Sequence, residues 1–130
     1  MTTDLSSLIV LRASAASLRV HEIASSVAAE VIRQVRRLTP SERFTLGDQL
    51  IRAAVSVAAN IAEACGRGST REFRRFLLYA RGSAQEVVSL LRIARDSGSG
   101  RREIMMSLES RTTLVLKMLV RLYNHPPPDR

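Results

Sequence analysis

The sequence has one cysteine, no tryptophan and only 4% aromatic residues. Because the single cysteine, Cys65, cannot form an intrachain disulfide, we expect the protein to reside in a reducing compartment, the cytoplasm. With so few aromatic residues, the core has to be built mainly from Ala, Val, Leu and Ile, which suits a helical bundle. The apolar runs fall far short of the roughly 18 residues that a membrane-spanning helix needs, and the N-terminus lacks the basic region of a signal peptide. We therefore expect no membrane segment and no membrane partner.

Residues suited to catalysis or metal binding are also scarce. The two histidines, His21 and His125, lie more than a hundred residues apart, and the sequence contains no cluster of carboxylates. No set of Cys, His, Asp or Glu has the spacing of a metal site. We therefore expect no metal, no cofactor and no enzymatic activity. The only pair that suggests an enzyme is Glu63 with Arg52, on one flank of a predicted helix.

Apolar residues three or four positions apart predict four helices in a single domain, at about 18–38, 46–64, 70–96 and 105–122. Residues 1–17 are expected to be an N-terminal tail or an extension of the first helix, 18–123 the bundle, and 124–130 a Pro-rich tail. The expected core positions are Val20, Ala24, Val27, Val31, Val35 and Leu38 in the first helix; Leu46, Leu50, Ala53, Val57, Ile61 and Ala64 in the second; Phe73, Phe76 or Leu77, Ala80, Ala84, Val87, Leu91 and Ala94 in the third; and Met105, Leu108, Thr112, Val115, Leu119 and Leu122 in the fourth.

Capping motifs mark several of the helix ends. Thr39-Pro40-Ser41-Glu42 has the form of a capping box with Pro at the first helical position, so we expect a short turn there before the second helix. Cys65-Gly66-Arg67-Gly68 supplies the glycine that a left-handed helix C-cap prefers, and Ser69-Thr70-Arg71-Glu72 forms another capping box. This stretch is therefore predicted to be a helix corner. It is not a nucleotide-binding loop, because its glycines follow a helix and no Lys-Ser/Thr pair comes after them.

The second helix carries a further apolar arc, nearly opposite its core face. Such a face is rarely left to water, so we predict that it forms the interface of a homo-oligomer. Small residues on a non-core side of the third helix, Gly82 and Ser89, support the same prediction. The residues of the arc are Ile51, Val55, Ala58 and Ala62.

Three polar residues near the end of the second helix are expected to have structural roles. Asn60 lies on the margin of the apolar face, and we expect it to form a hydrogen bond with a neighbouring helix or loop. Glu63 and Arg67 are four residues apart in the order that favours an ion pair, and Arg52 lies on the same flank as Glu63. We expect Arg52, Glu63 and Arg67 to form a polar latch at the corner.

The net charge of +8 permits an acidic partner such as RNA or DNA. The stretch from Arg67 to Arg81 alone carries five Arg and one Glu. On a helical wheel, Arg74, Arg81 and Arg92 form a ridge beside the core seam of the third helix, along which a phosphate backbone could lie. The predicted nucleic-acid contacts are Arg67, Arg71, Arg74, Arg75, Arg81 and Arg92, and Arg95, Arg101 and Arg102 extend the charge toward the next turn.

The same charges have an alternative explanation. They could form a solvated face, or pair with Glu30, Glu86 and Glu109. Nineteen of the twenty basic residues are Arg, a bias that a GC-rich coding sequence would also produce. Because few aromatic residues are available for base stacking, we expect any nucleic-acid binding to depend little on base sequence.

The segment LTPSERFTLGDQLIRAAVSVAANIAEACGRGSTREFRRFLLYARGSAQEV resembles the four-helix-bundle family of the 23S rRNA intervening-sequence proteins. The resemblance covers roughly residues 18–123, and it departs from the family at Ala64, where a Gly is usual, and at His21, where an aromatic residue is common. The matching residues are Pro40, Glu42, Phe44, Gln49, Leu50, Arg52, Ala53, Ala54, Ser56, Asn60, Ile61, Ala62, Glu63, Gly66, Arg67, Glu72 and Phe73.

The resemblance implies an all-α, antiparallel, up-down-up-down four-helix bundle that assembles as a ring, typically a homopentamer. It also implies kinship with the accessory proteins of diversity-generating retroelements, basic ring-forming proteins that engage nucleic acid and a reverse transcriptase. The resemblance supplies no enzymatic activity that could be carried over to this chain. We therefore expect a non-enzymatic ring that binds RNA or DNA through an Arg-rich face, and the alternative is a structural or protein-interaction scaffold without a nucleic-acid ligand.

Overall fold

A computed structural model describes residues 14–128 of the chain, which are helical for most of their length and contain no strand. The all-α prediction and the four long helices are confirmed. A three-residue segment, α3 (Pro40–Glu42), and a π-helical turn, η1 (Arg43–Gly47), precede the second long helix. The long helices are α2 (Ala15–Val35), α4 (Asp48–Cys65), α5 (Thr70–Ser97) and α6 (Arg102–Asn124).

The first helix begins earlier than its apolar pattern indicated. Ser14 caps α2, accepting a hydrogen bond from the backbone N–H of Ser17, while the Ser17 hydroxyl accepts one from the N–H of Ser14. This reciprocal cap starts the helix at Ala15 rather than at about residue 18. The rest of the expected N-terminal tail, residues 1–13, lies outside the described residues.

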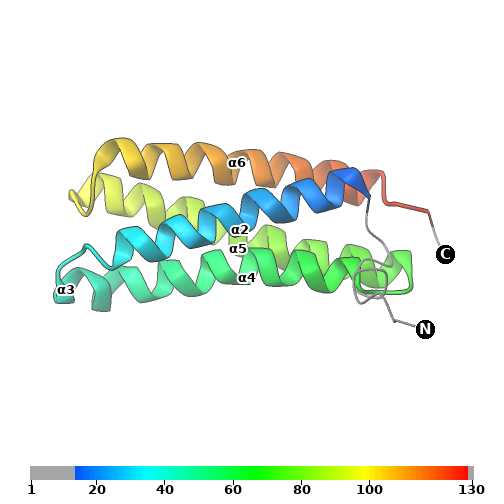
Figure 1. The fold of residues 1–130 in the computed structure, drawn as a ribbon, viewed down its shortest axis with the longest axis horizontal. Coiled ribbons are helices and arrows are strands. Elements are labelled where there is room, and N and C mark those ends of the chain that lie inside the picture. Colours follow the sequence, from blue (N-terminus) through cyan, green and yellow to red (C-terminus); the bar gives the residue numbers. More distant parts are fainter. Residues whose placement is uncertain (1–13, 129–130) are drawn as a thin grey trace, which may run out of the picture.

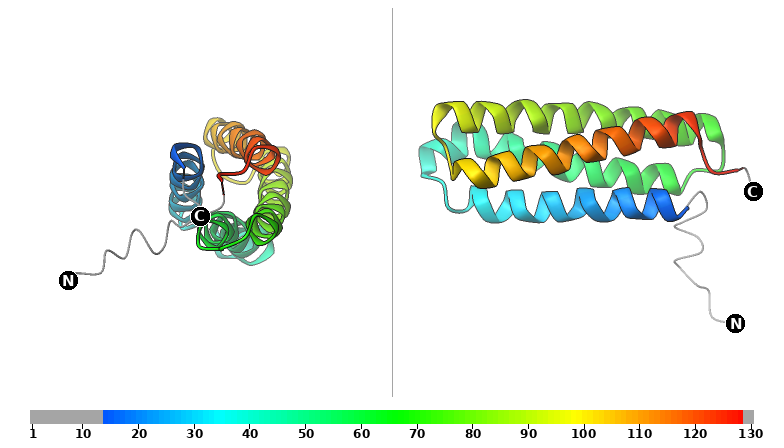
Figure 2. Two further views of the ribbon diagram at one scale, coloured as in Figure 1. Left: turned by 90° about the vertical axis from the view of Figure 1, so that its right-hand side faces the viewer. Right: turned by 90° about the horizontal axis from the view of Figure 1, so that it is seen from above.

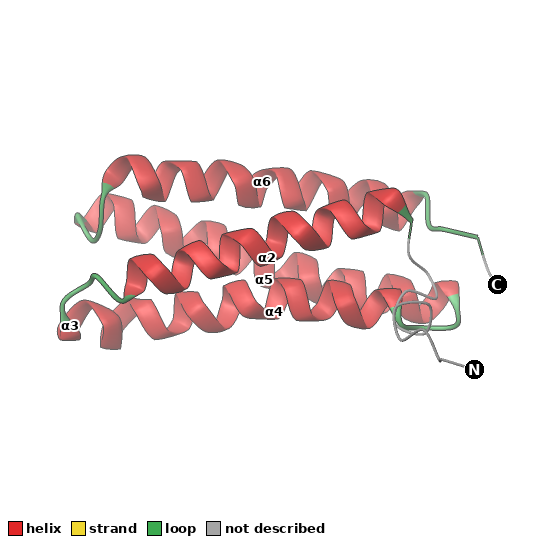
Figure 3. Cartoon of the chain, viewed as in Figure 1, coloured by secondary structure: helices red, strands yellow, loops and turns green. Residues whose placement is uncertain are grey.

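The four long helices lie alongside one another, and the connections between them alternate between the two ends of the molecule (Figure 1). We call one end the turn end; it holds α3, η1 and the turn between α5 and α6. The other, the corner end, holds the connection between α4 and α5. Seen along its length, the bundle places its helices around a common centre (Figure 2), and the connections between them are short (Figure 3).

The core follows the predicted apolar stripes closely. All six predicted positions of α6 are buried, and in α5 the core residue is Leu77 rather than the half-buried Phe76. Leu38 and Leu46, at the margins of their stripes, are only partly buried against the core. Truncating a fully buried side chain such as Ile61 to Ala is expected to destabilise the fold by about 2–5 kcal/mol.

The entry into α4 differs from the prediction of a turn followed by a helix. The capping box is confirmed: the Thr39 N–H donates to Glu42 Oε1 at 3.0 Å, and the Glu42 N–H donates to Thr39 Oγ1 at 3.2 Å. From Pro40 onward, however, the chain stays helical, widening only through η1. Gly47 makes this geometry possible, because a Cβ at this position would lie 2.6 Å from Cγ1 of Val35 in α2.

The left-handed glycine cap lies at a different helix connection from the one that we predicted. Gly66 ends α4 with a φ of −84°, so the predicted left-handed cap is wrong at this position. The left-handed cap lies at Gly98, which ends α5 with a φ of 78°. The capping box predicted at the start of α5 is half formed: Ser69 Oγ accepts from the Glu72 N–H, but the Glu72 carboxylate pairs with Arg75 instead.

Candidate nucleic-acid interface

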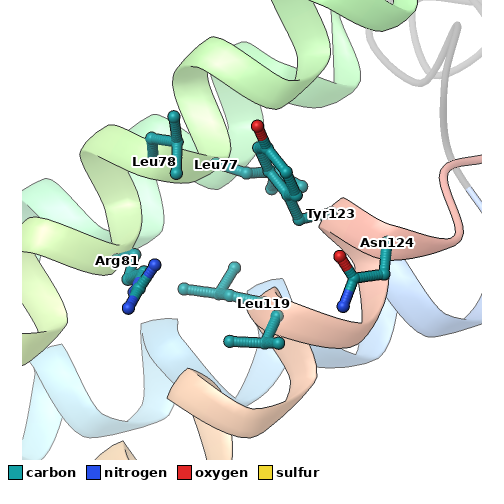
Figure 4. Close-up of a pocket in the computed structure, with 7 residues that line it drawn as sticks. Leu77, Leu78, Arg81, Leu119, Tyr123 and Asn124 are labelled. Atoms are coloured by element: carbon teal, nitrogen blue, oxygen red, sulfur yellow. The ribbon is translucent and has the colours of Figure 1, made fainter.

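The predicted arginine ridge on α5 runs beside α6, which two of its three residues contact. Arg74 donates an Nε hydrogen bond of 2.9 Å to the backbone carbonyl of Tyr123, and Arg92 forms an ion pair of 2.7 Å with Glu109. Arg81 lies between them on the rim of a pocket of about 260 Å³ between α5 and α6 (Figure 4). Two of the three ridge residues therefore fasten the neighbouring helix.

The remaining predicted contacts lie around the corner end. Arg67 pairs with Glu63 at 2.8 Å, and Arg75 pairs with Glu72 at 2.7 Å. Both guanidinium groups also lie over the ring of Phe76. Arg71, like Arg81, is exposed and makes no ion pair with another described residue. Ion pairing thus accounts for Arg67, Arg75 and Arg92, but only Arg92 pairs with a glutamate that the alternative explanation named, Glu109.

Glu109 is the centre of a small charge cluster between α5 and α6. Its Oε1 accepts from Arg92, and its Oε2 accepts from Nη1 of Arg95 at 2.8 Å. The Glu109 side chain is only 14% exposed and that of Arg95 22%. The positive charge that we expected Arg95 to add to the ridge is therefore largely neutralised within the bundle.

Several of the unpaired arginines lie at the turn end. Five of them are exposed and make no ion pair with any residue of 14–128. We call this group the arginine end. Two follow α2, one lies in η1, and two stand at the start of α6: Arg36, Arg37, Arg43, Arg101 and Arg102.

Contacts between the connections bring the segments of the arginine end together. A Cβ at Gly100 would lie 3.7 Å from Cδ2 of Leu38, so the turn before α6 is close to the segment after α2. Hydrogen bonds from Thr39 and from Ser99 lower the pKa of the Glu42 carboxyl, which links the same two segments. The sequence pattern indicated only Arg101 and Arg102 of this group, because its members are separated by as many as 66 positions.

An exposed aromatic residue belongs to the same end of the bundle. Phe44 follows Arg43 in η1, and 85% of its surface is accessible to solvent. Among the large apolar side chains of the described residues, it is the most exposed. We had expected few aromatic residues to be available for stacking on bases, but the fold presents this one in the same turn as an unpaired arginine.

The polar residues of α4 face α5, with one partner that we did not predict. Ser56 Oγ lies 2.8 Å from Ser83 Oγ, and Asn60 donates to the carbonyl and the hydroxyl of Ser56. The expected bond from Asn60 to another helix is therefore wrong, since Ser56 makes the connection across the helices. Ser83 gave no signal in the sequence, because serines are common on exposed helix faces.

Gln49 and Arg52 belong to the same α4–α5 face, where they line a shallow pocket of about 320 Å³ with Ser56, Ser83 and Glu86. The predicted latch is thus divided: Glu63 and Arg67 pair at the corner, while Arg52 lies three helical turns away. In the part of the chain that the structure describes, no three His, Cys, Asp or Glu residues gather as a metal site.

The arc predicted to form a subunit interface is also divided. Ile51 and Ala58 pack partly against the core of their own subunit, and Ala62 is half-buried. Val55 is 45% exposed and is the member that remains available to a partner.

Two further findings concern the cysteine and the helices. Burial raises the pKa of the Cys65 thiol. None of the helices within 14–128 is both long and apolar enough to cross a membrane.

Comparisons with known proteins agree with the observed fold. The model of the 23S rRNA-intervening sequence protein family matches residues 16–121. A crystal structure of a protein with unknown function from the S23 ribosomal protein family of Bacteroides thetaiotaomicron VPI-5482 is similar, with a TM-score of 0.78 and 23% identity over 84% of this chain and 98% of that one. No curated protein matches the sequence. Since the family match spans most of the chain, the protein belongs to the 23S rRNA-intervening sequence protein family.

Proposed function

We propose that this protein is a non-enzymatic, up-down-up-down antiparallel bundle that binds the phosphates of RNA or DNA at its arginine end. The observation that carries the proposal is that five exposed arginines from three segments share this end without an ion pair among the described residues. By contrast, most of the arginines that we first predicted as contacts have partners within the bundle. The proposed surface therefore moves from the face of α5 to the turn end.

Two of these arginines do not stabilise the helix at whose start they lie. Arg101 is the N-cap of α6 and Arg102 its first residue, and cations are disfavoured at the positive end of the helix dipole. A bound phosphate would reverse this unfavourable interaction. The planar guanidinium group also matches the oxygens of a phosphate better than an ammonium does.

We further propose that the subunits assemble as a ring, which the family resemblance suggests is a homopentamer. Exposed apolar side chains on the sides of the bundle, Val55, Leu78, Ile93 and Val120, support such an assembly. A ring would repeat the arginine end around its axis, and a weak phosphate site present in several copies binds a long polymer tightly. A scaffold without a nucleic-acid ligand would use the same apolar side chains and leave the arginine end unoccupied.

Salt-dependent binding tests the proposal. Fluorescence anisotropy with a labelled single-stranded RNA should show affinity that falls steeply with salt, each phosphate contact adding about 0.7 to the log-log slope. The variant Arg36→Gln/Arg37→Gln/Arg102→Gln should flatten that slope and weaken binding. Circular dichroism should show unchanged helicity, because these side chains are exposed.

A control variant of equal charge separates a local site from a general effect of net charge. Arg33→Gln/Arg67→Gln/Arg75→Gln also removes three positive charges, but from arginines that are paired with glutamates. We expect this control to retain most of the affinity. Equal losses in both variants would contradict a site at the arginine end, and no binding by the wild type at low salt would favour the scaffold.

A further inference from the structure

Phe44 is the most exposed large apolar side chain of the described residues, and packing does not explain its position. A phenylalanine with 85% of its surface in water contributes little to a hydrophobic core. It lies in η1, and single π-helical turns inside helices occur frequently at functional sites. The aromatic ring is therefore accessible to a ligand outside the subunit.

The turn that carries Phe44 is held in place from both sides. On its N-terminal side, the capping box of Thr39 and Glu42 fixes α3, and the α5–α6 turn lies close by, since a Cβ at Gly100 would be 3.7 Å from Cδ2 of Leu38. On its C-terminal side, Gly47 lies directly against Val35. The Phe44 backbone is thus fixed relative to the segments that carry the arginine end.

Charge identifies the class of ligand. An apolar protein surface that covered Phe44 would bring exposed Arg43, its neighbour, to the edge of the contact, where a partner of negative charge is favoured. The unpaired arginines at this end favour an anionic ligand, and the ring favours a flat apolar face. Single-stranded nucleic acid offers both, because its bases are free to stack on aromatic side chains while its phosphates meet the arginines.

We infer that a base of single-stranded RNA or DNA stacks on Phe44 while neighbouring phosphates contact Arg43 and the rest of the arginine end. This inference rests on the proposed nucleic-acid binding and specifies its substrate as single-stranded. In a duplex the faces of the bases are already stacked on one another, so Phe44 gains no contact there. Every base has a flat face, so the preference for single strands should depend little on sequence.

Substitution of Phe44 tests the inference. Phe44→Ala should weaken binding to a single-stranded RNA by about 5- to 150-fold, the usual loss for one stacked base. Its binding to the duplex of the same sequence, and the salt dependence of that binding, should not change, because the arginines remain. As a matched control, Leu18→Ala removes another exposed apolar side chain, at the corner end, and should leave both affinities unchanged.

Because the sequence contains no tryptophan, a tryptophan introduced at position 44 would be a direct fluorescent probe of the site. Phe44→Trp introduces a single indole, whose fluorescence should be quenched by single-stranded RNA and not by the duplex. This variant should also keep the wild-type affinity. Equal losses of single-strand and duplex binding in Phe44→Ala, or no loss at all, would overturn the stacking inference.

The failure of stacking is distinguishable from the failure of the proposed function. If the wild type binds RNA with a steep salt dependence and Phe44→Ala binds equally well, only the stacking inference fails. If the wild type binds no nucleic acid at low salt, both fail. A lower assembly mass for Phe44→Ala in light scattering would instead assign Phe44 to a subunit interface and overturn the inference.

Discussion

Arg74 of α5 caps the C-terminus of α6 by donating a 2.9 Å hydrogen bond from Nε to the backbone carbonyl of Tyr123. The guanidinium carbon also lies 5.3 Å from the centroid of the Tyr123 ring. Carbonyls in the last turn of a helix lack intrahelical partners, so this contact satisfies an acceptor that would otherwise depend on water. A residue that we first assigned to phosphate binding therefore has a structural role.

Replacing Arg74 with Ala should lower the free energy of unfolding by about 1–2 kcal/mol, because it removes a charged hydrogen bond and a cation–π contact. Urea denaturation followed by circular dichroism measures the change. Arg71→Ala is the control, since this arginine is exposed and unpaired among the described residues. Equal stabilities for the two variants would show that the Arg74 contact adds nothing.

Glu109 should matter more for stability than either of its partners. Glu109→Ala leaves Arg95, whose side chain is only 22% exposed, without its main counter-charge. We expect a loss of about 2 kcal/mol, less than for a fully buried ion pair because water still reaches the cluster. Arg92→Ala should cost about 0.5 kcal/mol, since the Arg92 side chain is 60% exposed. Thermal denaturation of the two variants compares these values, and a larger effect for Arg92→Ala would contradict the assignment.

The hydroxyl pair of Ser56 and Ser83 should couple α4 to α5. Removing one hydroxyl leaves the other without its partner, so each single Ala substitution should cost about 1 kcal/mol. The double substitution should cost less than the sum of the two single ones. A double-mutant cycle based on urea denaturation measures this coupling. Strict additivity would show that the two hydroxyls do not interact.

Acid should weaken the α3 capping box through Glu42. Hydrogen bonds from Thr39 and Ser99 hold the pKa of this carboxyl below its ordinary value in the folded state. Its contribution to stability is therefore present above the ordinary pKa, and is lost as the pH falls through the folded pKa. Melting temperatures of the wild type and Glu42→Gln, measured from about pH 6 to about pH 3, should converge at the acid end.

A difference between the wild type and Glu42→Gln that stays constant across this range would contradict a depressed pKa at the cap.

Self-assembly should depend on Val55. Light scattering on the purified protein should give a mass of several subunits of 14.4 kDa, about five if the family resemblance holds. Val55→Glu places a charge on an exposed position of α4 and should dissociate the assembly without unfolding the subunit, because the core residues are unchanged. Leu114→Glu places the same charge at an equally exposed site on α6 and tests whether that site also belongs to the interface. A monomeric wild type at micromolar concentration would refute the prediction.

The helices and their core could be predicted because burial repeats with the helical period. Each of the six α6 positions from Met105 to Leu122 appeared in the sequence pattern and is buried. A helical wheel also placed Arg74 and Arg92 correctly on one face of α5. It could not show that this face meets α6, because a wheel contains no information about neighbouring helices.

Features that join distant segments were missed for the same reason. The arginine end combines residues after α2, within η1 and at the start of α6, which only the folded chain brings together. The partner of Ser56 lies 27 positions away in α5. The left-handed glycine was assigned to the stretch 65–68 rather than to Gly98, since both follow an apolar pattern and only backbone geometry distinguishes them.

The π-helical turn before α4 sets the rotation of the preceding segment about the helix axis. A π turn contains one residue more than an α-helical turn, so it offsets the phase of the preceding segment by about 100° relative to α4. Loss of one residue from 43–46 would convert it to a regular turn and swing the segment before it around the helix axis, leaving the register from Leu50 onward intact. Relatives that differ in length here by a single codon would therefore present a different surface at the turn end while keeping the same core.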